Sequence, residues 1–115
     1  GRIFEGDYKE MWNSLKKLRS LSRKTLIYCG HEYTLSNAKF ALSLSQDNLD
    51  LKKIFLEIQK LRKNGISTIP SILHEERKFN PFLRVDEELF LKNVNLYGLK
   101  DWEVFREIRK MKDVF

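Results

Sequence analysis

The chain has 115 residues but only one cysteine, Cys29. It therefore cannot form an internal disulfide, which fits a reducing compartment. No apolar run approaches the ~20 residues that a membrane-spanning helix needs, and the first residues do not have a secretory signal pattern. A disulfide-stapled protein and a membrane protein are therefore not expected.

Catalytic motifs and metal ligands are also scarce. The sequence has no Gly-rich phosphate loop and no serine nucleophile elbow. It has only two histidines, His31 and His74, with no cysteine pair and no His-x-His. Zinc needs at least three protein ligands, so a complete metal site within this chain is not expected. His74 lies among charged residues and is expected at the surface.

The charge is positive, with 22 Lys+Arg against 16 Asp+Glu and a net charge of +6. This favours an anionic partner, such as a nucleic acid, an acidic membrane surface or a small anion. The alternative is an ordinary solvated surface, because acidic residues are interleaved throughout. The aromatics lie on helix stripes rather than among basic residues, and no nucleic-acid motif is present, so nucleic-acid binding is not expected.

What remains is enough apolar sequence for one domain or a piece of a larger one. The run Thr25–Cys29 predicts a buried strand, with an inert thiol at Cys29. Ile3–Phe4 is either the end of a strand or a loop, and we expect no strand after Thr34. Apolar spacing predicts these helices: Tyr8–Leu18, Leu35–Leu44, Leu51–Lys63, a short one after Ser71, Glu87–Val94, and a last one opening at Asp101. Their expected N-caps are Asp7, Asp50, Ser71 and Asp86, and Gly65 is expected to end the third helix.

The stretch Tyr28-Cys29-Gly30-His31-Glu32-Tyr33-Thr34-Leu35 is the most informative part of the sequence. It takes the chain from a predicted strand to a predicted helix, and ligands bind at such strand ends in open α/β sheets. His31 is therefore placed like a metal ligand or catalytic base, and Tyr33 like a substrate contact. Structural or surface roles for His31, and a cap or ion pair for Glu32, are the alternatives.

The predicted last helix carries several cations. Arg109 and Lys112 are three residues apart and so share a face. They could clamp a carboxylate, or they could simply complement the helix dipole.

Several stretches together are similar to glyoxalase II (hydroxyacylglutathione hydrolase), a branch of the metallo-β-lactamase superfamily. They are Gly1-Arg2-Ile3-Phe4-Glu5-Gly6, Tyr28 to Thr34, Asn37-Ala38-Lys39-Phe40-Ala41, Thr68-Ile69-Pro70-Ser71, Glu75-Glu76, Asn80-Pro81-Phe82-Leu83-Arg84 and Arg109-Lys110-Met111-Lys112-Asp113. They occur in the family's order over almost the whole chain; only the segment around Phe90–Lys100 matches poorly.

The resemblance implies hydrolysis of S-D-lactoylglutathione to D-lactate and glutathione, a step of methylglyoxal detoxification. It implies a dinuclear metal centre, with two zinc ions expected and iron or manganese as alternatives. It makes His31 a metal ligand and places Arg2, Tyr33, Arg109 and Lys112 at the glutathione moiety. Phe4 falls where some members have a glutathione-contacting tyrosine, and without a hydroxyl it can only pack.

The family's Thr-His-x-His-x-Asp-His motif is absent and would lie before residue 1. The resemblance therefore covers the C-terminal part: residues 1–33 as the last strand-helix-strand of a metallo-β-lactamase αββα domain, and residues 34–115 as an all-helical glutathione-binding domain. The expected fold class is α+β, mostly α. The intact protein is expected to be a thioester hydrolase. Its expected partners are the glutathione thioester and its own N-terminal half, and it is otherwise expected to be a monomer. This chain alone is expected to be inactive. An inactive module that binds glutathione conjugates or pairs with a partner is the alternative. The cytoplasm is the expected compartment, with mitochondria as the alternative.

Overall fold

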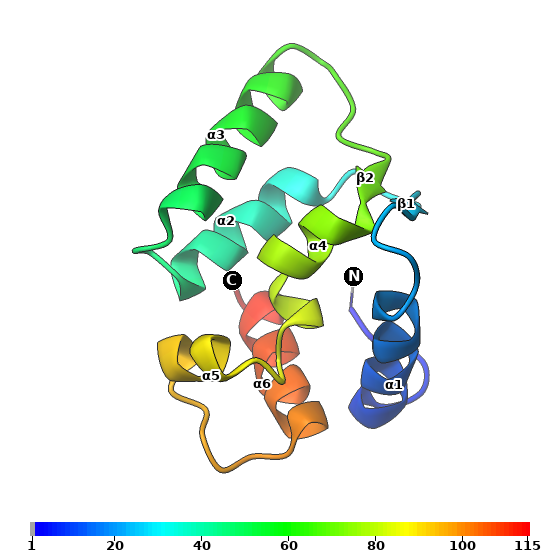
Figure 1. Ribbon diagram of the computed structural model, residues 1–115, viewed down its shortest axis with the longest axis vertical. Coiled ribbons are helices and arrows are strands. Elements are labelled where there is room, and N and C mark those ends of the chain that lie inside the picture. The colour runs from blue at the N-terminus through cyan, green and yellow to red at the C-terminus, as the bar shows by residue number, and fades with distance from the viewer. Residues whose placement is uncertain (1) are drawn as a thin grey trace. The chain divides into compact units, whose positions relative to one another are not determined.

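The computed structural model describes residues 2–115, and this part of the chain is mostly helical (Figure 1). In chain order the elements are α1 (Tyr8–Arg19), β1 (Leu26–Ile27), α2 (Thr34–Leu44), α3 (Leu49–Lys63), β2 (Ser71–Ile72), α4 (Leu73–Phe79), the 3-10 helix η1 (Pro81–Leu83), α5 (Glu88–Val94) and α6 (Asp101–Asp113). Within residues 2–115 no helix is long and apolar enough to cross a membrane. The predicted mostly helical architecture is confirmed, whereas Ile3–Phe4 lies outside any strand.

The chain forms two compact units. Unit 1 contains residues 2–21 and 81–115, and unit 2 is the continuous segment Ser22–Asn80. Unit 1 is therefore discontinuous in sequence. The domain boundary between residues 33 and 34 stays a prediction.

Unit 1 is built around the packing of α1 on α6. Helix α1 begins where predicted, because the Asp7 carboxylate accepts the main-chain N–H of Glu10 at 2.8 Å. Trp12 is completely buried, and its ring centroid lies 6.2 Å from that of Phe105 on α6. Phe82 of η1 meets Phe105 edge-on at 6.0 Å. Burial of large apolar side chains such as these stabilises a fold by about 1.5–3 kcal/mol each.

Unit 2 contains the packed helices α2 and α3. Asn48, rather than Asp50, is the N-cap of α3, and its side chain accepts the main-chain N–H of Leu51 at 3.0 Å. The predicted cap was wrong because α3 begins two residues earlier, which puts Asp50 in its first turn. Gly65 ends the helix as predicted, with a φ of 70° that favours glycine.

The predicted buried strand is shorter and more open than expected. Only Leu26–Ile27 is a strand, and it pairs antiparallel with Ser71–Ile72. Leu26 is 50% exposed and Cys29 is also exposed, so the predictions of a buried strand and a buried thiol were wrong. An apolar run is buried only where other elements cover it, and in residues 2–115 the sheet has just two strands. The expectation of no strand after Thr34 was also wrong, because β2 lies there.

Two further predicted caps have other roles. Ser71 belongs to β2, and α4 begins after it, at Leu73. Asp86 does not cap α5, because its carboxylate pairs with Arg19 instead. Both residue types suit a cap, but here strand pairing and an ion pair engage them.

Candidate functional site

His31 and Tyr33 lie in the loop that leads from β1 to α2. Their rings are stacked face to face, with centroids 5.1 Å apart and planes inclined by 6°. Both side chains are exposed. The structure therefore brings two predicted site residues of unit 2 into direct contact, with both available to a ligand.

Glu32, between these two aromatic residues, binds the segment that follows α3. Its Oε1 accepts the main-chain N–H of Thr68 at 2.6 Å, and its Oε2 accepts the Thr68 hydroxyl at 2.8 Å. The Ser67 hydroxyl lies 3.2 Å from Oε1, and Arg62 Nη1 lies 3.7 Å from it. The predicted ion pair is thus present, but hydrogen bonds to Thr68 are the closer contacts.

These contacts also set the protonation of Glu32. Partial burial acts to raise the pKa of its carboxyl, but the hydrogen bonds from Thr68 and Ser67 and the charge of Arg62 outweigh burial. The pKa is therefore lowered from its ordinary value. Glu32 is a carboxylate at neutral pH and accepts hydrogen bonds only.

The second group of predicted site residues lies at the C-terminal end of α6, in unit 1. Arg109 is buried, with its side chain 8% exposed. Its Nη2 lies 2.8 Å and its Nε 3.0 Å from Oδ1 of Asp113, and its guanidinium lies 4.8 Å from the centre of the Phe82 ring. Asp113 and Phe82 therefore fix this guanidinium, and Nη1 is the nitrogen outside the Asp113 pair.

Arg2 and Lys112 lie at the same helix end. Arg2 Nη2 donates to the main-chain carbonyl of Asp113 at 3.3 Å. Lys112 is half-buried, with Nζ 5.8 Å from the centre of the Phe115 ring. Arg2 and Arg109 thus both bind Asp113, although they come from opposite ends of the chain, and Lys112 precedes Asp113 on α6. Phe4, the other predicted substrate-binding residue near the N-terminus, is 87% exposed and so packs little on residues 2–115.

A complete metal site is absent from the described part of the chain, as no group of three or more His, Cys, Asp or Glu side chains could hold an ion there. His31 offers a single exposed imidazole. His74 is exposed, as predicted, and its Nδ1 accepts from Arg23 Nε at 3.3 Å. Among the residues that the structure describes, His31 is thus a single candidate ligand and not part of a metal site.

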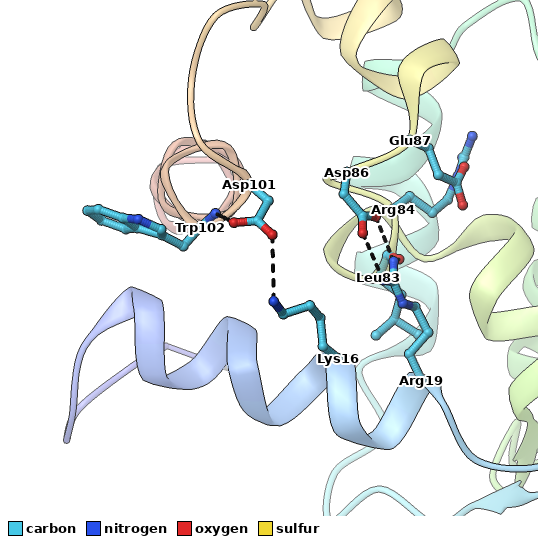
Figure 2. Close-up of polar contacts among 8 residues, drawn as sticks. All are labelled: Lys16, Arg19, Leu83, Arg84, Asp86, Glu87, Asp101 and Trp102. Atoms are coloured by element: carbon cyan, nitrogen blue, oxygen red, sulfur yellow. Dashed lines mark hydrogen bonds and ion pairs between the residues drawn. The ribbon is translucent and has the colours of Figure 1, made fainter.

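A polar network that the sequence did not predict holds unit 1 together (Figure 2). Arg19 on α1 binds both carboxylate oxygens of Asp86, at 2.6 and 2.8 Å, and also donates to the Leu83 carbonyl at 3.0 Å. Nearby, Lys16 lies 3.7 Å from Asp101 at the start of α6. The network fixes α1 to the segment that carries Phe82, the ring under Arg109.

Sequence reasoning missed the roles of Asp113 and Thr68. Asp113 follows Arg109 by four residues on one helix, a spacing that could have identified the pair. Thr68 is 36 residues from Glu32, and no local pattern links the two.

Comparisons with known proteins agree on one family. The family model described as the hydroxyacylglutathione hydrolase C-terminus matches residues 32–115. A protein named hydroxyacylglutathione hydrolase from Methylococcus capsulatus is 44% identical over the whole chain, and those of Chelativorans sp. and Bartonella henselae are each 50% identical over it. The chain covers 45%, 45% and 46% of these relatives, so it spans less than half their length. The chain therefore belongs to the hydroxyacylglutathione hydrolase family and corresponds to its C-terminal part.

Proposed function

We propose that this chain is the C-terminal part of a glyoxalase II, which hydrolyses S-D-lactoylglutathione to D-lactate and glutathione. Family membership supports this proposal, since relatives that carry the name match the chain over its full length. The observation that carries the substrate class is the gathering of Arg2, Arg109 and Lys112 at one end of α6. Glutathione thioesters are anionic, and such cations bind carboxylates.

Each cation contributes differently. Lys112 supplies a flexible point charge, and Arg2 is exposed. Arg109 is already oriented by Asp113, and its positive charge would favour a substrate carboxylate nearby. Tyr33 combines an exposed ring with a hydroxyl that can donate to the substrate.

His31 would supply one imidazole to a metal centre whose other ligands belong to the N-terminal half of the longer protein. Two zinc ions are proposed, with iron or manganese as alternatives. When bound, such metals lower the pKa of water and stabilise developing negative charge. Binding of the substrate by this chain would orient the thioester for attack.

The test is hydrolysis of S-D-lactoylglutathione with zinc supplied, by this chain and by a longer protein that includes the N-terminal half. Activity in the longer protein only is expected. Tight binding of two zinc ions and turnover by the 115-residue chain would refute the division of roles. Inactivity of both, with retained binding of glutathione conjugates, would favour the binding-module alternative.

A further inference from the structure

The loop that carries His31 and Tyr33 is anchored through the residue between them. Glu32 accepts two short hydrogen bonds from Thr68, one from the main chain and one from the side chain. Two bonds to one residue fix both the position and the rotation of a carboxylate. Because the Glu32 side chain is fixed, the main chain of Glu32 and its peptide bonds to His31 and Tyr33 are also restrained.

The anchor continues into α2. The hydroxyls of Thr68 and Thr34 lie 2.6 Å apart, and Thr34 is the first residue of α2. The Thr68 hydroxyl has one hydrogen, so donating it to Glu32 leaves Thr68 to accept from Thr34. Tyr33 therefore lies between two residues, Glu32 and Thr34, that are both bound to Thr68.

We infer that Glu32 is a positioning residue, which holds the loop so that the His31 and Tyr33 rings stay stacked and face the substrate together. The part of this inference that concerns the substrate rests on the proposed function. The part that concerns the stacking of the two rings does not. The Glu32 carboxylate is engaged by Thr68, Ser67 and Arg62 rather than open to a ligand. Glu32 thus acts through its two neighbours and does not itself touch the reacting groups.

NMR of the full 115-residue chain tests the stack directly. With only two histidines in the sequence, His31 is readily distinguished from His74, which serves as an internal reference. The Tyr33 ring current shifts the His31 ring protons upfield. In Glu32→Ala we expect the His31 signals to move toward free-histidine positions, and the Thr68 amide to exchange about tenfold faster, equivalent to about 1.4 kcal/mol.

Three further variants separate anchoring from general destabilisation. Thr68→Val removes the hydroxyl but keeps the main-chain bond, so we expect an intermediate shift. Glu32→Gln keeps an acceptor for the Thr68 amide, so we expect partial rescue. Glu57→Gln, an exposed glutamate on α3, is the matched control and should resemble the unchanged chain. If Glu32→Ala fails to fold, the His31 signals of Thr68→Val and Glu32→Gln decide whether the inference holds.

Unchanged His31 signals or an unchanged Thr68 exchange rate in Glu32→Ala would overturn the inference. In a longer protein that hydrolyses the thioester, Glu32→Ala should also raise KM about tenfold while Glu57→Gln leaves it unchanged, because the loop no longer presents both rings. If Glu32→Ala loses the His31–Tyr33 stack by NMR but keeps an unchanged KM, the part of the inference that concerns the substrate would be overturned. Failure of the proposed function itself would appear separately, as absent hydrolysis by the longer protein with the NMR result intact.

Discussion

The Arg19–Asp86 pair should contribute measurably to the stability of unit 1. Asp86→Asn removes the negative charge but keeps the side chain's shape and one acceptor oxygen. A hydrogen bond to a charged group contributes about 1.5–3 kcal/mol, and the unchanged chain has two here, at 2.6 and 2.8 Å. Asp86 is 33% exposed, so water replaces part of what is lost, and we expect a net loss of about 1–2 kcal/mol.

The loss should depend on pH in a defined direction. The hydrogen bonds from Arg19 hold the pKa of the Asp86 carboxyl below its ordinary value. The unfolded chain, with an ordinary Asp pKa of about 3.9, then takes up protons before the folded chain does. The stabilisation is fully present above about pH 4 and is lost as the pH falls through the folded pKa. The difference between the two proteins should therefore shrink at low pH.

Urea unfolding of the unchanged chain and of Asp86→Asn, at pH 7 and at pH 3, measures both effects. Asp47→Asn makes the same chemical change at an exposed loop residue and should alter the free energy of unfolding by less than about 0.5 kcal/mol. A loss at pH 7 no larger than that of the control would refute the reasoning. So would a loss that is the same at both pH values.

Four predictions concern the proposed site in the longer protein. Tyr33→Phe should raise KM by the equivalent of about 0.5–1.5 kcal/mol, the contribution of one hydrogen bond, and an unchanged KM would count against that contact. His31→Ala should lower metal content and turnover together, and normal metal loading would refute its role as a ligand. Lys112→Met should raise KM while its helix neighbour Lys110→Met does not, with stability altered in both by less than about 0.5 kcal/mol. Arg109→Met should differ by also lowering the free energy of unfolding, by about 1–3 kcal/mol, because it leaves Asp113 without its partner.

Local signals predicted the helices well. Asp7 and Gly65 mark helix ends through chemistry contained within a few residues, and both predictions hold. The stripe of apolar side chains on α3 was likewise readable from its spacing. Caps failed where two polar residues competed, as with Asn48 and Asp50.

Long-range pairings were not readable from the sequence. Strand β1 pairs with β2, which is distant in sequence, and Leu26 lies opposite Ile72. Neither strand is long enough to show the alternation of apolar and polar residues that predicts a strand. The same holds for the contact between Glu32 and Thr68. His31 and Tyr33 were singled out because they lie between a predicted strand and a predicted helix, whereas their stacking could be seen only in the structure.

The discontinuity of unit 1 has a consequence for the order of folding during synthesis. Helices α2 and α3 are near neighbours in the chain and can pair early, at a small cost in loop-closure entropy. Helix α1 is synthesised before α6, so its Trp12 face has no partner until Phe105 on α6 has been made. In that interval an aromatic surface is exposed to aggregation and to chaperones. Arg2 likewise meets the Asp113 carbonyl only after α6 has been made.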